Sequence, residues 1–594
     1  MIVSPPAAFF APSPIALFDD NLGDGVSRLM SEPVELLCCT SPDTLAETLA
    51  RIDAAQAAGH WVAIAAAYEL GYVLEPRLAP QRPASDTPLL QAWVFARCDE
   101  IDDAATDAWL DAQDSAQPTG LVDLEAQLSR ERYLAAIGQI KAYIADGDCY
   151  QANFTFAFSA RAFGDPYRLY QRLRAAQPVH YGALILHPDG CLMSRSPELF
   201  VHRRGDTLTC KPMKGTAPID EPPSALTASE KNRAENLMIV DLIRNDLGRL
   251  APPGGVQVPA LFEAEPYRTL WQMTSTVTAR PVSAPLGEIL QALFPCGSVT
   301  GAPKIRAMEI LRTLETGPRG IYCGAIGWIA PNGDFSFNVP IRTLAITPSG
   351  ALRCHTGSGI VNDSDPAGEW DECLLKLRFL TRLPSDIQLI ETLRCEGGSD
   401  DVYPWLEDHL ARLSTSAAAL GFACDAHAVC DVLQNTARAL KGTHRVRLCL
   451  SQTGEIVITH EALAPLSGPQ TVSLSAHVLD STHPLLAHKT TARGIYATEL
   501  PRAMAAGHFD TLFFNENDEL AEGCRSNVFV QIHGQVFTPP TNAGLLNGVC
   551  RRRELRAGAV TERTITRAEL VRAERIWLGN ALRGRFEVSL VCDD

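Results

Sequence analysis

The sequence predicts a mixed α/β (α+β) protein built from more than one domain. The chain has 594 residues, which is more than a single hydrophobic core usually accommodates. Apolar residues recur at helical spacing in stretches such as 129–144, whereas 199–201 is a short strand-like run. Near 383–386 the first series of elements ends and a second series begins. We therefore expect one domain over 1–382 and another over 386–594.

Composition and charge are typical of a globular protein with neither nucleic-acid nor membrane partners. Hydrophobic residues make up 46% of the chain, charged residues 20%, and the net charge is −17. The densest basic cluster, Arg551–Arg553, is small and is expected to lie on a helix. No run of about 18 apolar residues predicts a membrane span, and Met1–Asp20 lacks the basic start of a signal peptide. Seventeen scattered cysteines suit a reducing compartment, so we expect a cytoplasmic protein.

The first half of the chain alternates apolar runs with helical patterns. Residues 1–120 contain Ala-rich helical stretches such as 44–56 but no catalytic constellation. A helix is expected from Ser129 to about residue 145, and a strand-like run follows at Cys149–Asn153. Another helix is expected over 224–249. Its apolar stripe consists of Leu237, Val240, Ile243 and Leu247.

Several later elements carry recognisable start signals. Thr300 can cap a helix whose first turn contains Pro303. The N-terminus of that helix together with Lys304 would form an anion-binding site. The plain alternative is that these residues only start a helix. We expect a helix over 270–275 and strands over 325–329 and 335–346.

The segment Cys210–Thr216 is the strongest candidate for a reactive site. Lys211 and Lys214 flank Pro212, which fixes the local φ, and Gly215 allows backbone to come close to a ligand. Alone, the segment is equally compatible with a solvated turn. Glu198 lies sixteen residues before Lys214, and an acidic helix follows, which favours a site.

Five segments of the first half carry a resemblance to a known family: 147–153, 196–198, 210–216, 235–246 and 300–304. They resemble the chorismate-utilising enzymes, specifically component I of aminodeoxychorismate synthases. The resemblance implies a two-layered fold with antiparallel sheets and helices, in which 1–120 is an N-terminal subregion and 121–382 the catalytic core. It leaves open whether 1–120 forms a pocket for a tryptophan-type ligand.

The resemblance also implies roles for individual residues. Lys214 would be a covalent nucleophile, in a place where anthranilate synthases carry alanine, and Glu198 would donate a proton. Glu235 and Glu372 would bind Mg²⁺, with Glu369 beside them, although a solvated carboxylate or a salt-bridge ladder with Lys376 is the plain alternative. The substrate-binding residues would be Gly215, Thr216, Thr300, Lys304, Tyr322, Arg342, Gly357, Ser358, Gly359 and Lys376. Gly357–Gly359 would form a turn that presents backbone amides to a carboxylate.

Residues 386–594 resemble the fold class IV enzymes that use pyridoxal 5′-phosphate, a group with aminotransferases and aminodeoxychorismate lyase. Lys489, otherwise an ordinary solvated lysine, would form the Schiff base, and Glu522, thirty-three residues later, would keep the pyridine nitrogen protonated. The remaining cofactor contacts would come from Arg412, Val549, Cys550 and Asn580. Two hydroxyls common in relatives are missing, because cysteine stands at 550 and alanine at 581.

The two resemblances together imply consecutive reactions. Chorismate and ammonia would give 4-amino-4-deoxychorismate, and loss of pyruvate would then give 4-aminobenzoate. No Gly-x-Cys-x-Gly glutaminase motif is evident, so we expect ammonia from a separate glutamine amidotransferase subunit or from solution. The resemblance of the second half also suggests a homodimer through that half. Three alternatives stay open: an anthranilate or salicylate-type synthase in the first half, an aminotransferase in the second, or a second half that is an inactive scaffold.

Overall fold

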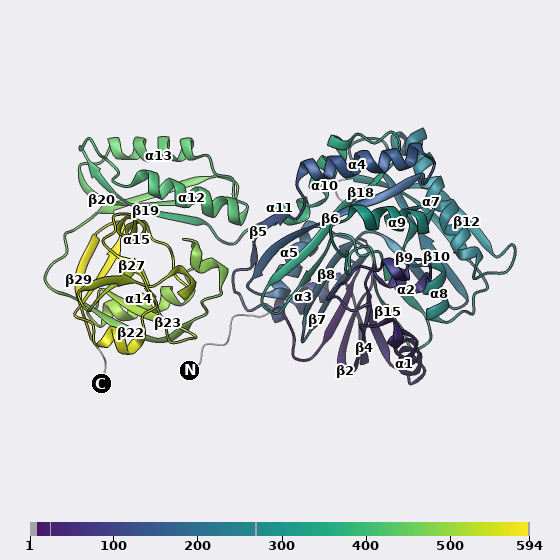
Figure 1. Cartoon of the computed structure of the whole chain (residues 1–594), viewed down its shortest axis with the longest axis horizontal. Coiled ribbons are helices and arrows are strands. Elements are labelled where there is room, and N and C mark those ends of the chain that lie inside the picture. The colour runs from purple at the N-terminus through teal and green to yellow at the C-terminus, as the bar shows by residue number, and fades with distance from the viewer. Residues whose placement is uncertain (1–8, 24, 268–269, 592–594) are drawn as a thin grey trace. The chain divides into compact units, whose positions relative to one another are not determined.

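The computed structural model describes residues 9–23, 25–267 and 270–591, which form two compact units (Figure 1). The N-terminal unit takes in 9–117 and 124–383, and the C-terminal unit takes in 384–591 with 118–123. Residues 1–8, the start of the segment considered for a signal peptide, lie outside the described residues. None of the helices described is long and apolar enough to cross a membrane.

Antiparallel strands make up the framework of the N-terminal unit. The first strands along the chain are β1 (Ile15–Asp19), β2 (Ser27–Cys39), β3 (Trp61–Ala66), β4 (Leu90–Ile101), β5 (Gly120–Ala126), β6 (Gln151–Phe163), β7 (Tyr181–His187), β8 (Gly190–Ser196) and β9 (Leu199–Arg204). Of β5, only 124–126 belong to this unit. The later strands are β10 (Thr207–Lys211), β11 (Met213–Pro218), β12 (Val256–Pro266), β13 (Leu270–Ala279), β14 (Gly301–Ala302), β15 (Ala325–Ile329), β16 (Phe335–Asn338), β17 (Thr343–Ile346) and β18 (Ala351–Ile360).

Helices cover this framework. They are α1 (Leu45–Ala57), α2 (Leu70–Leu74), α3 (Asp103–Gln113), α4 (Arg130–Ala145), α5 (Pro166–Ala176), α6 (Pro223–Thr227), α7 (Glu230–Gly248), α8 (Leu286–Leu293), α9 (Lys304–Leu314), α10 (Pro366–Lys376) and α11 (Arg378–Thr381), with short 3₁₀ turns η1 (Pro42–Thr44), η2 (Ala79–Gln81) and η3 (Gly297–Val299). In Figure 1, α4 and α10 lie together over β6 and β18. One core joins α7 and α8 to the sheet through Ile239, Leu290 and Phe337.

Strand register brings the predicted reactive residues together. The β9–β10 hairpin pairs Leu199 with Lys211. The chain therefore comes back next to Glu198 where β11, which carries Lys214, begins. The long β6–β18 pair places Gly359 opposite Asn153. Because antiparallel pairing sets every later position along both strands, these two registers fix which side chains meet.

The C-terminal unit has two sheets and its own core. Its strands are β19 (Leu389–Gly397), β20 (Gly442–Leu450), β21 (Ile456–Ala462), β22 (Gln470–Leu479), β23 (Asp510–Asn515), β24 (Leu520–Gly523), β25 (Asn527–Ile532), β26 (Gln535–Thr538), β27 (Thr561–Glu562), β28 (Arg575–Asn580) and β29 (Gly584–Leu590). Its helices are α12 (Leu406–Leu420), α13 (Ala426–Arg438), α14 (Gly494–Ala505), α15 (Val549–Arg556) and α16 (Arg567–Val571), with 3₁₀ turns η4 (Pro484–Ala487) and η5 (Thr541–Ala543). The first sheet, β19–β20–β21, is antiparallel, and the second is mixed, with parallel pairs such as β22–β23. The mixed α+β class is thereby confirmed.

Local predictions succeeded where the pattern was strong. The helix after Ser129 is confirmed as α4, with Ser129 as its N-cap and Tyr133, Ile137 and Ile140 buried. The helix expected over 224–249 is instead two helices, α6 and α7, and Leu237 of its predicted apolar stripe is half exposed.

Three predicted elements were wrong. Residues 270–275 belong to strand β13, because this stretch pairs with β11 and β12. Gly357–Gly359 is not a turn but the interior of β18. The strand expected over 335–346 is broken into β16 and β17, and Arg342 lies in the break with a φ of 50°.

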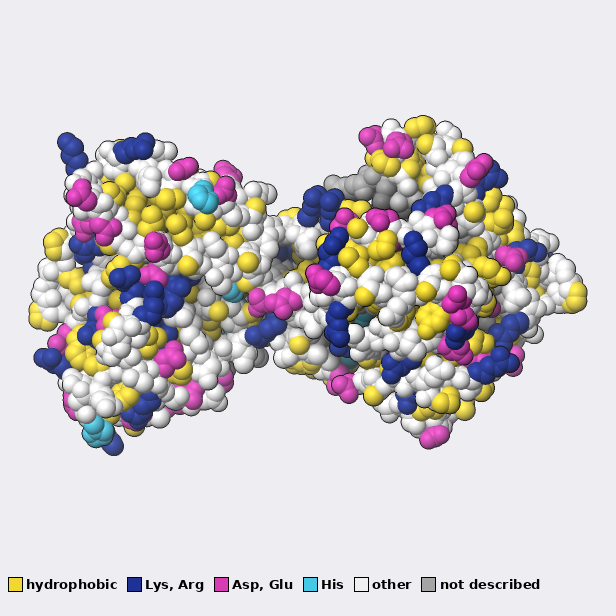
Figure 2. All heavy atoms as spheres, turned by 45° about the horizontal axis from the view of Figure 1, so that its top comes forward, with side chains coloured by type: hydrophobic (Ala, Val, Ile, Leu, Met, Phe, Trp, Pro, Cys, Tyr) yellow, Lys and Arg dark blue, Asp and Glu magenta, His cyan; other side chains and the backbone are white. Residues whose placement is uncertain are grey.

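On the face shown in Figure 2, acidic and basic side chains of the N-terminal unit are interspersed around apolar ones. An anionic ligand of this acidic chain would therefore depend on a few cations gathered within a site rather than on the general surface charge.

Candidate functional site

Lys214 and Glu198 are neighbours whose ionisation is shifted by burial. Burial raises the pKa of Glu198 to about 7, although the hydroxyl of Ser298 and the charge of Lys214 oppose the rise. Burial lowers the pKa of Lys214; Glu198 opposes this and Lys376 adds to it. Lys211 pairs with Glu265, but in the described part of the chain Lys214 makes no ion pair. Both shifts favour the neutral forms, an amine and a carboxylic acid.

The strand that carries Lys214 is held by specific contacts on both sides. Gly215 has a φ of 84°, and a Cβ atom there would lie 2.9 Å from the Asn232 side chain on α7. The amide of Gln272 on β13 donates a hydrogen bond to the Gly215 carbonyl at 2.9 Å. Thr216, the next residue, is exposed and pairs with Gln272 in the strand ladder.

Gln151 approaches the same amine from β6. A Cβ atom at Gly359 would lie 2.5 Å from Nε2 of Gln151 and 3.4 Å from Nζ of Lys214, so only glycine leaves room for both. Gln151 is buried, and Nε2 has no hydrogen-bond partner among the described residues. Sequence reasoning missed this residue, although it lies inside a segment that carried the resemblance.

Two carboxylates of the helices, Glu235 on α7 and Glu372 on α10, interact electrostatically with the Lys214 amine, and Glu369 on α10 interacts with Glu235. Burial raises the pKa of Glu235; Lys214 and Lys231 oppose the rise, while Glu369 and Glu372 add to it. Glu372 lies 2.9 Å from Lys376, whose ammonium also donates to the Gly357 carbonyl at 2.8 Å. Burial alone would raise the pKa of Glu372, but Lys376, Lys214 and Lys231 together outweigh burial and the pKa is lowered.

These carboxylates match Mg²⁺ in chemistry but do not yet converge. Within the described ranges, no group of three or more acidic, histidine or cysteine side chains is close enough to hold a metal ion as it stands. The mutual repulsion that acts on Glu235 is nevertheless what a hard dication relieves, and carboxylate oxygens are the ligands that Mg²⁺ prefers.

The predicted anion-binding residues differ in how far they are already paired. Arg342 has no carboxylate partner within the described structure, and burial lowers the pKa of its guanidinium beside Tyr267 and Tyr322. Tyr322 stacks on His355 with ring centres 5.3 Å apart. Lys304 instead lies 2.7 Å from Asp246 of α7 and donates to the Leu293 carbonyl. Its charge is balanced within the protein, and a substrate contact by Lys304 stays a prediction.

The Thr300 and Ser358 side chains are buried, and both make hydrogen bonds within the protein. The Thr300 hydroxyl donates to the Cys296 carbonyl at 2.8 Å, and α9 begins at Lys304 with Pro303 as its N-cap. The predicted capping role of Thr300 was therefore wrong. The Ser358 hydroxyl lies 2.8 Å from the hydroxyl of Tyr133 on α4.

In the C-terminal unit, Lys489 and the buried Glu522 are a second pair of interacting ionisable groups. Burial lowers the pKa of Lys489 to about 7, Arg412 and Arg493 add to this, and Glu391 and Glu522 oppose it. The Lys489 carbonyl accepts a hydrogen bond from the Ile390 amide of β19 at 2.8 Å, which anchors the lysine. Burial also raises the pKa of Glu522 to about 7. The Glu522 carboxylate accepts hydrogen bonds from the Tyr496 hydroxyl and the Leu546 amide.

The remaining predicted cofactor residues occupy defined places. Arg412 makes a two-fold ion pair with Glu391 through Nε and Nη2, at 2.8 and 2.6 Å. Val549 and Cys550 open α15, whose N-terminus has no capping side chain in the described structure. The Asn580 side chain accepts from the Leu582 and Arg583 amides of its own turn. An uncapped helix start suits a phosphate, so these groups fit pyridoxal phosphate.

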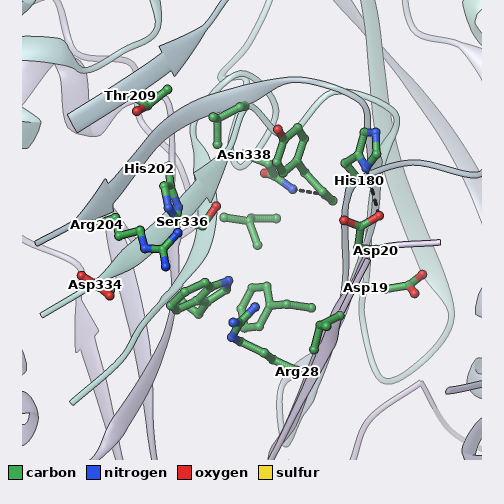
Figure 3. Close-up of a pocket in the computed structure, with 17 residues that line it drawn as sticks. Asp19, Asp20, Arg28, His180, His202, Arg204, Thr209, Asp334, Ser336 and Asn338 are labelled. Carbon is green, nitrogen blue, oxygen red and sulfur yellow. Dashed lines mark hydrogen bonds and ion pairs between the residues drawn. The ribbon is translucent and has the colours of Figure 1, made fainter. Parts of the chain in front are cut away.

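A cavity of about 590 Å³ lies elsewhere in the N-terminal unit (Figure 3). As far as the chain is described, no predicted site residue lines it. Arg28 lies over the Trp328 ring at 4.3 Å, Asp20 pairs with His180 at 3.0 Å, and Oδ1 of the buried Asn338 has no partner there. Residues of the 1–120 subregion thus contribute to a polar cavity large enough for a small molecule.

Comparison with known proteins identifies the class of the chain. Residues 39–382, more than half of it, match the chorismate binding enzyme family, and the chain belongs to that family. Residues 388–591 match a second family, amino-transferase class IV.

The relatives include two kinds of chorismate-binding protein. Aminodeoxychorismate synthase component 1 of Klebsiella aerogenes is 42% identical over 290 residues, which cover 47% of this chain and 64% of that protein. Anthranilate synthase component 1 1 of Haloarcula marismortui is 37% identical over 305 residues, which cover 50% and 62%. The chain spans less than two thirds of either relative. The solved structure of anthranilate synthase component I from Streptococcus pneumoniae shares the fold, with a TM-score of 0.52, 23% identity, and 61% of this chain and 93% of that chain covered.

Proposed function

We propose that the N-terminal unit converts chorismate and ammonia to 4-amino-4-deoxychorismate, and that the C-terminal unit then releases pyruvate to leave 4-aminobenzoate. The observation that carries the first step is that Lys214 lies beside the buried Glu198 and that both pKa shifts favour the neutral forms. A neutral amine is a nucleophile, and a neutral carboxyl is a proton donor. The relatives named aminodeoxychorismate synthase component 1 support the choice of substrate.

In this proposal, bond making and breaking are shared between the two side chains. The Lys214 amine adds to the chorismate ring as the bond from C4 to its hydroxyl breaks, and the Glu198 proton leaves with that hydroxyl as water. Ammonia then adds at C4 and displaces Lys214, which recovers its free amine. Because Gln151 and Gly359 confine Nζ, the amine reaches the ring in a restricted direction.

Two different positive groups would balance the negative carboxylates of the substrate. Arg342, which lacks a carboxylate partner within the described residues, would hold one substrate carboxylate. Glu235 and Glu372, with Glu369 beside them, would hold Mg²⁺, which when bound supplies positive charge for the other carboxylate. Lys376 would keep Glu372 ionised for that purpose.

Ammonia would come from a separate glutamine amidotransferase subunit or from solution. The support is the name of the relatives, since a "component 1" implies a second component. The C-terminal unit is in addition proposed to form a homodimer, following its resemblance to the fold class IV enzymes.

In the second step, pyridoxal phosphate, when bound, supplies an electron sink. Lys489 would hold the cofactor and then take the C4 proton of the aminodeoxychorismate onto Nζ, for which its lowered pKa is suitable. Glu522 would face the ring nitrogen, while Arg412 and the amides of Val549 and Cys550 would meet the phosphate. Departure of pyruvate makes the ring aromatic.

A second candidate for the C-terminal unit is amino-group transfer between an amine donor and a keto acid. The match of 388–591 to amino-transferase class IV favours it. Under this alternative, aminodeoxychorismate would accumulate and no pyruvate would be released from it.

Mass spectrometry of the products tests the proposal directly. The full chain would be given chorismate, ammonium and Mg²⁺, with and without pyridoxal phosphate. We expect aminodeoxychorismate without the cofactor and 4-aminobenzoate with pyruvate when it is present. Anthranilate as the sole product would contradict the first step, and unchanged aminodeoxychorismate in the presence of the cofactor would contradict the second.

A further inference from the structure

Ser298 contacts the carboxyl group of Glu198 from a distant part of the chain. Ser298 lies in η3, and its hydroxyl donates a hydrogen bond to Oε1 of Glu198 at 2.6 Å. Both side chains are almost fully buried, with 2% and 3% of their surface exposed. Cys296 Sγ lies 3.1 Å from the same hydroxyl. The bond is therefore shielded from water, where a hydrogen bond to a carboxyl group is strongest.

The rest of Glu198 is held as firmly as its Oε1 atom. Its amide donates to the Ser196 hydroxyl at 3.2 Å, and its carbonyl accepts from the Val339 amide at 3.0 Å. With the backbone and one carboxyl oxygen fixed, the carboxyl plane is fixed as well. Within the described structure, Oε2 has no hydrogen-bond partner, so the two oxygens are not equivalent.

We propose that Ser298 is a positioning residue for proton transfer by Glu198: its hydroxyl holds Oε1 so that the proton resides on Oε2, facing the substrate. This inference rests on the proposed amination of chorismate. In that step the Oε2 proton passes to the C4 hydroxyl, which departs as water while Lys214 bonds to the ring, and Glu198 is left as a carboxylate. The Ser298 bond strengthens as negative charge develops, so it stabilises the transition state more than the ground state.

Among the residues that the structure describes, the ionisable groups that interact with Glu198 are Lys214, Tyr267, Cys296 and Cys323. Burial raises the pKa values of Tyr267, Cys296 and Cys323, so these three stay neutral near pH 7. Lys214 and Ser298 both lower the pKa of Glu198 against the effect of burial. Loss of the Ser298 hydroxyl is therefore expected to raise it.

The test compares three serine variants of the full chain in the amination of chorismate with ammonium and Mg²⁺. Ser298→Ala is expected to lower kcat by about 10- to 100-fold, as for a lost hydrogen bond to a charged group, with KM changed less than about 3-fold. The pH at which activity declines on the alkaline side is expected to move upward. Ser298→Thr, which keeps a hydroxyl, is expected to restore most of kcat.

Ser475→Ala is the matched control, because Ser475 donates to the buried Glu499 at 3.0 Å in the C-terminal unit. It is expected to leave the amination rate and pH profile unchanged. If the Ser298→Ala enzyme keeps the wild-type kcat and pH profile, the role of Ser298 is overturned while the proposed function stands. The same holds if kcat and thermal stability fall together and the pH profile does not move. A wild-type protein that does not aminate chorismate overturns both this inference and the proposed function.

Discussion

Burial acts in opposite directions on the two central side chains of the N-terminal unit. Desolvation raises the pKa of the Glu198 carboxyl and lowers that of the Lys214 amine, because each loses the water that stabilises its charged form. An exposed pair of the same residues would be fully ionised at pH 7 and would form an ordinary ion pair. Withdrawal from water is therefore what makes this lysine a nucleophile and this glutamate an acid in the proposed reaction.

Replacing Glu198, the proposed acid, tests whether the proton of its carboxyl group is needed for amination. Glu198→Gln keeps the shape of the side chain but cannot donate a proton to the departing hydroxyl. We expect kcat for amination to fall by about 10² to 10⁴-fold. In the wild type, activity is expected to decline as the pH rises through about 7, because Glu198 then loses its proton. Near-normal turnover by the variant at every pH would rule Glu198 out as the acid.

Lys489 allows a residue-scale test that does not depend on turnover. Its pKa of about 7 means that the neutral amine, which bonds to an aldehyde, becomes the main form as the pH rises through that value. We expect the rate of pyridoxal phosphate loading, followed by visible absorbance, to increase from pH 6 to pH 8 and then level off. Lys489→Ala should show no such absorbance band. Equal loading by the variant would mean that another lysine binds the cofactor.

At the scale of elements, β18 shows why glycine occurs in the interior of a strand. Gly359 is flanked by Gln151 on β6 and by Lys214 on β11, and a side chain at 359 would compete with both. Asp365 at the start of α10 accepts a hydrogen bond from the Gly368 amide and so caps the helix that carries Glu369 and Glu372. One strand thus leaves room for the ends of the Gln151 and Lys214 side chains, and one helix carries two of the proposed Mg²⁺ ligands.

Gly359→Ala is expected to lower activity without unfolding the protein. The added methyl would push on the end of the buried Gln151 side chain and contact the Lys214 amine, and displacements of about 1 Å at a reacting group cost up to about 100-fold in rate. Thermal unfolding and steady-state amination would be measured together. Gly138→Ala on α4, where a Cβ atom meets nothing within 4 Å, is the control. Unimpaired amination by Gly359→Ala would contradict the proposed confinement of Lys214.

At the scale of the whole molecule, each unit has its own core, its own sheets and a lysine with a lowered pKa. The two proposed reactions therefore depend on different lysines, and each can be removed separately. Their products follow in sequence, since the molecule released by the first is the substrate of the second.

Lysine variants of the full chain should separate the two reactions. Lys489→Ala is expected to accumulate aminodeoxychorismate from chorismate and ammonium, because only the second step is blocked. Lys214→Ala is expected to lose amination yet still release pyruvate from added aminodeoxychorismate. A chelator should abolish the first step only, given that the proposed Mg²⁺ ligands all lie in the N-terminal unit. Loss of both steps in either single variant would contradict this division of labour.

The sequence by itself determined the mixed fold class, the helix after Ser129 and the family motifs, because these depend on residues close together in the chain. It misassigned 270–275 and Gly357–Gly359, where pairing with distant strands overrides local preference. Only the tertiary structure decided that Lys304 is balanced by Asp246, that Ser298 holds Glu198, and that Gln151 faces Lys214. Those contacts join residues about 60 to 100 positions apart, and the burial that sets their protonation exists only once the whole unit has packed.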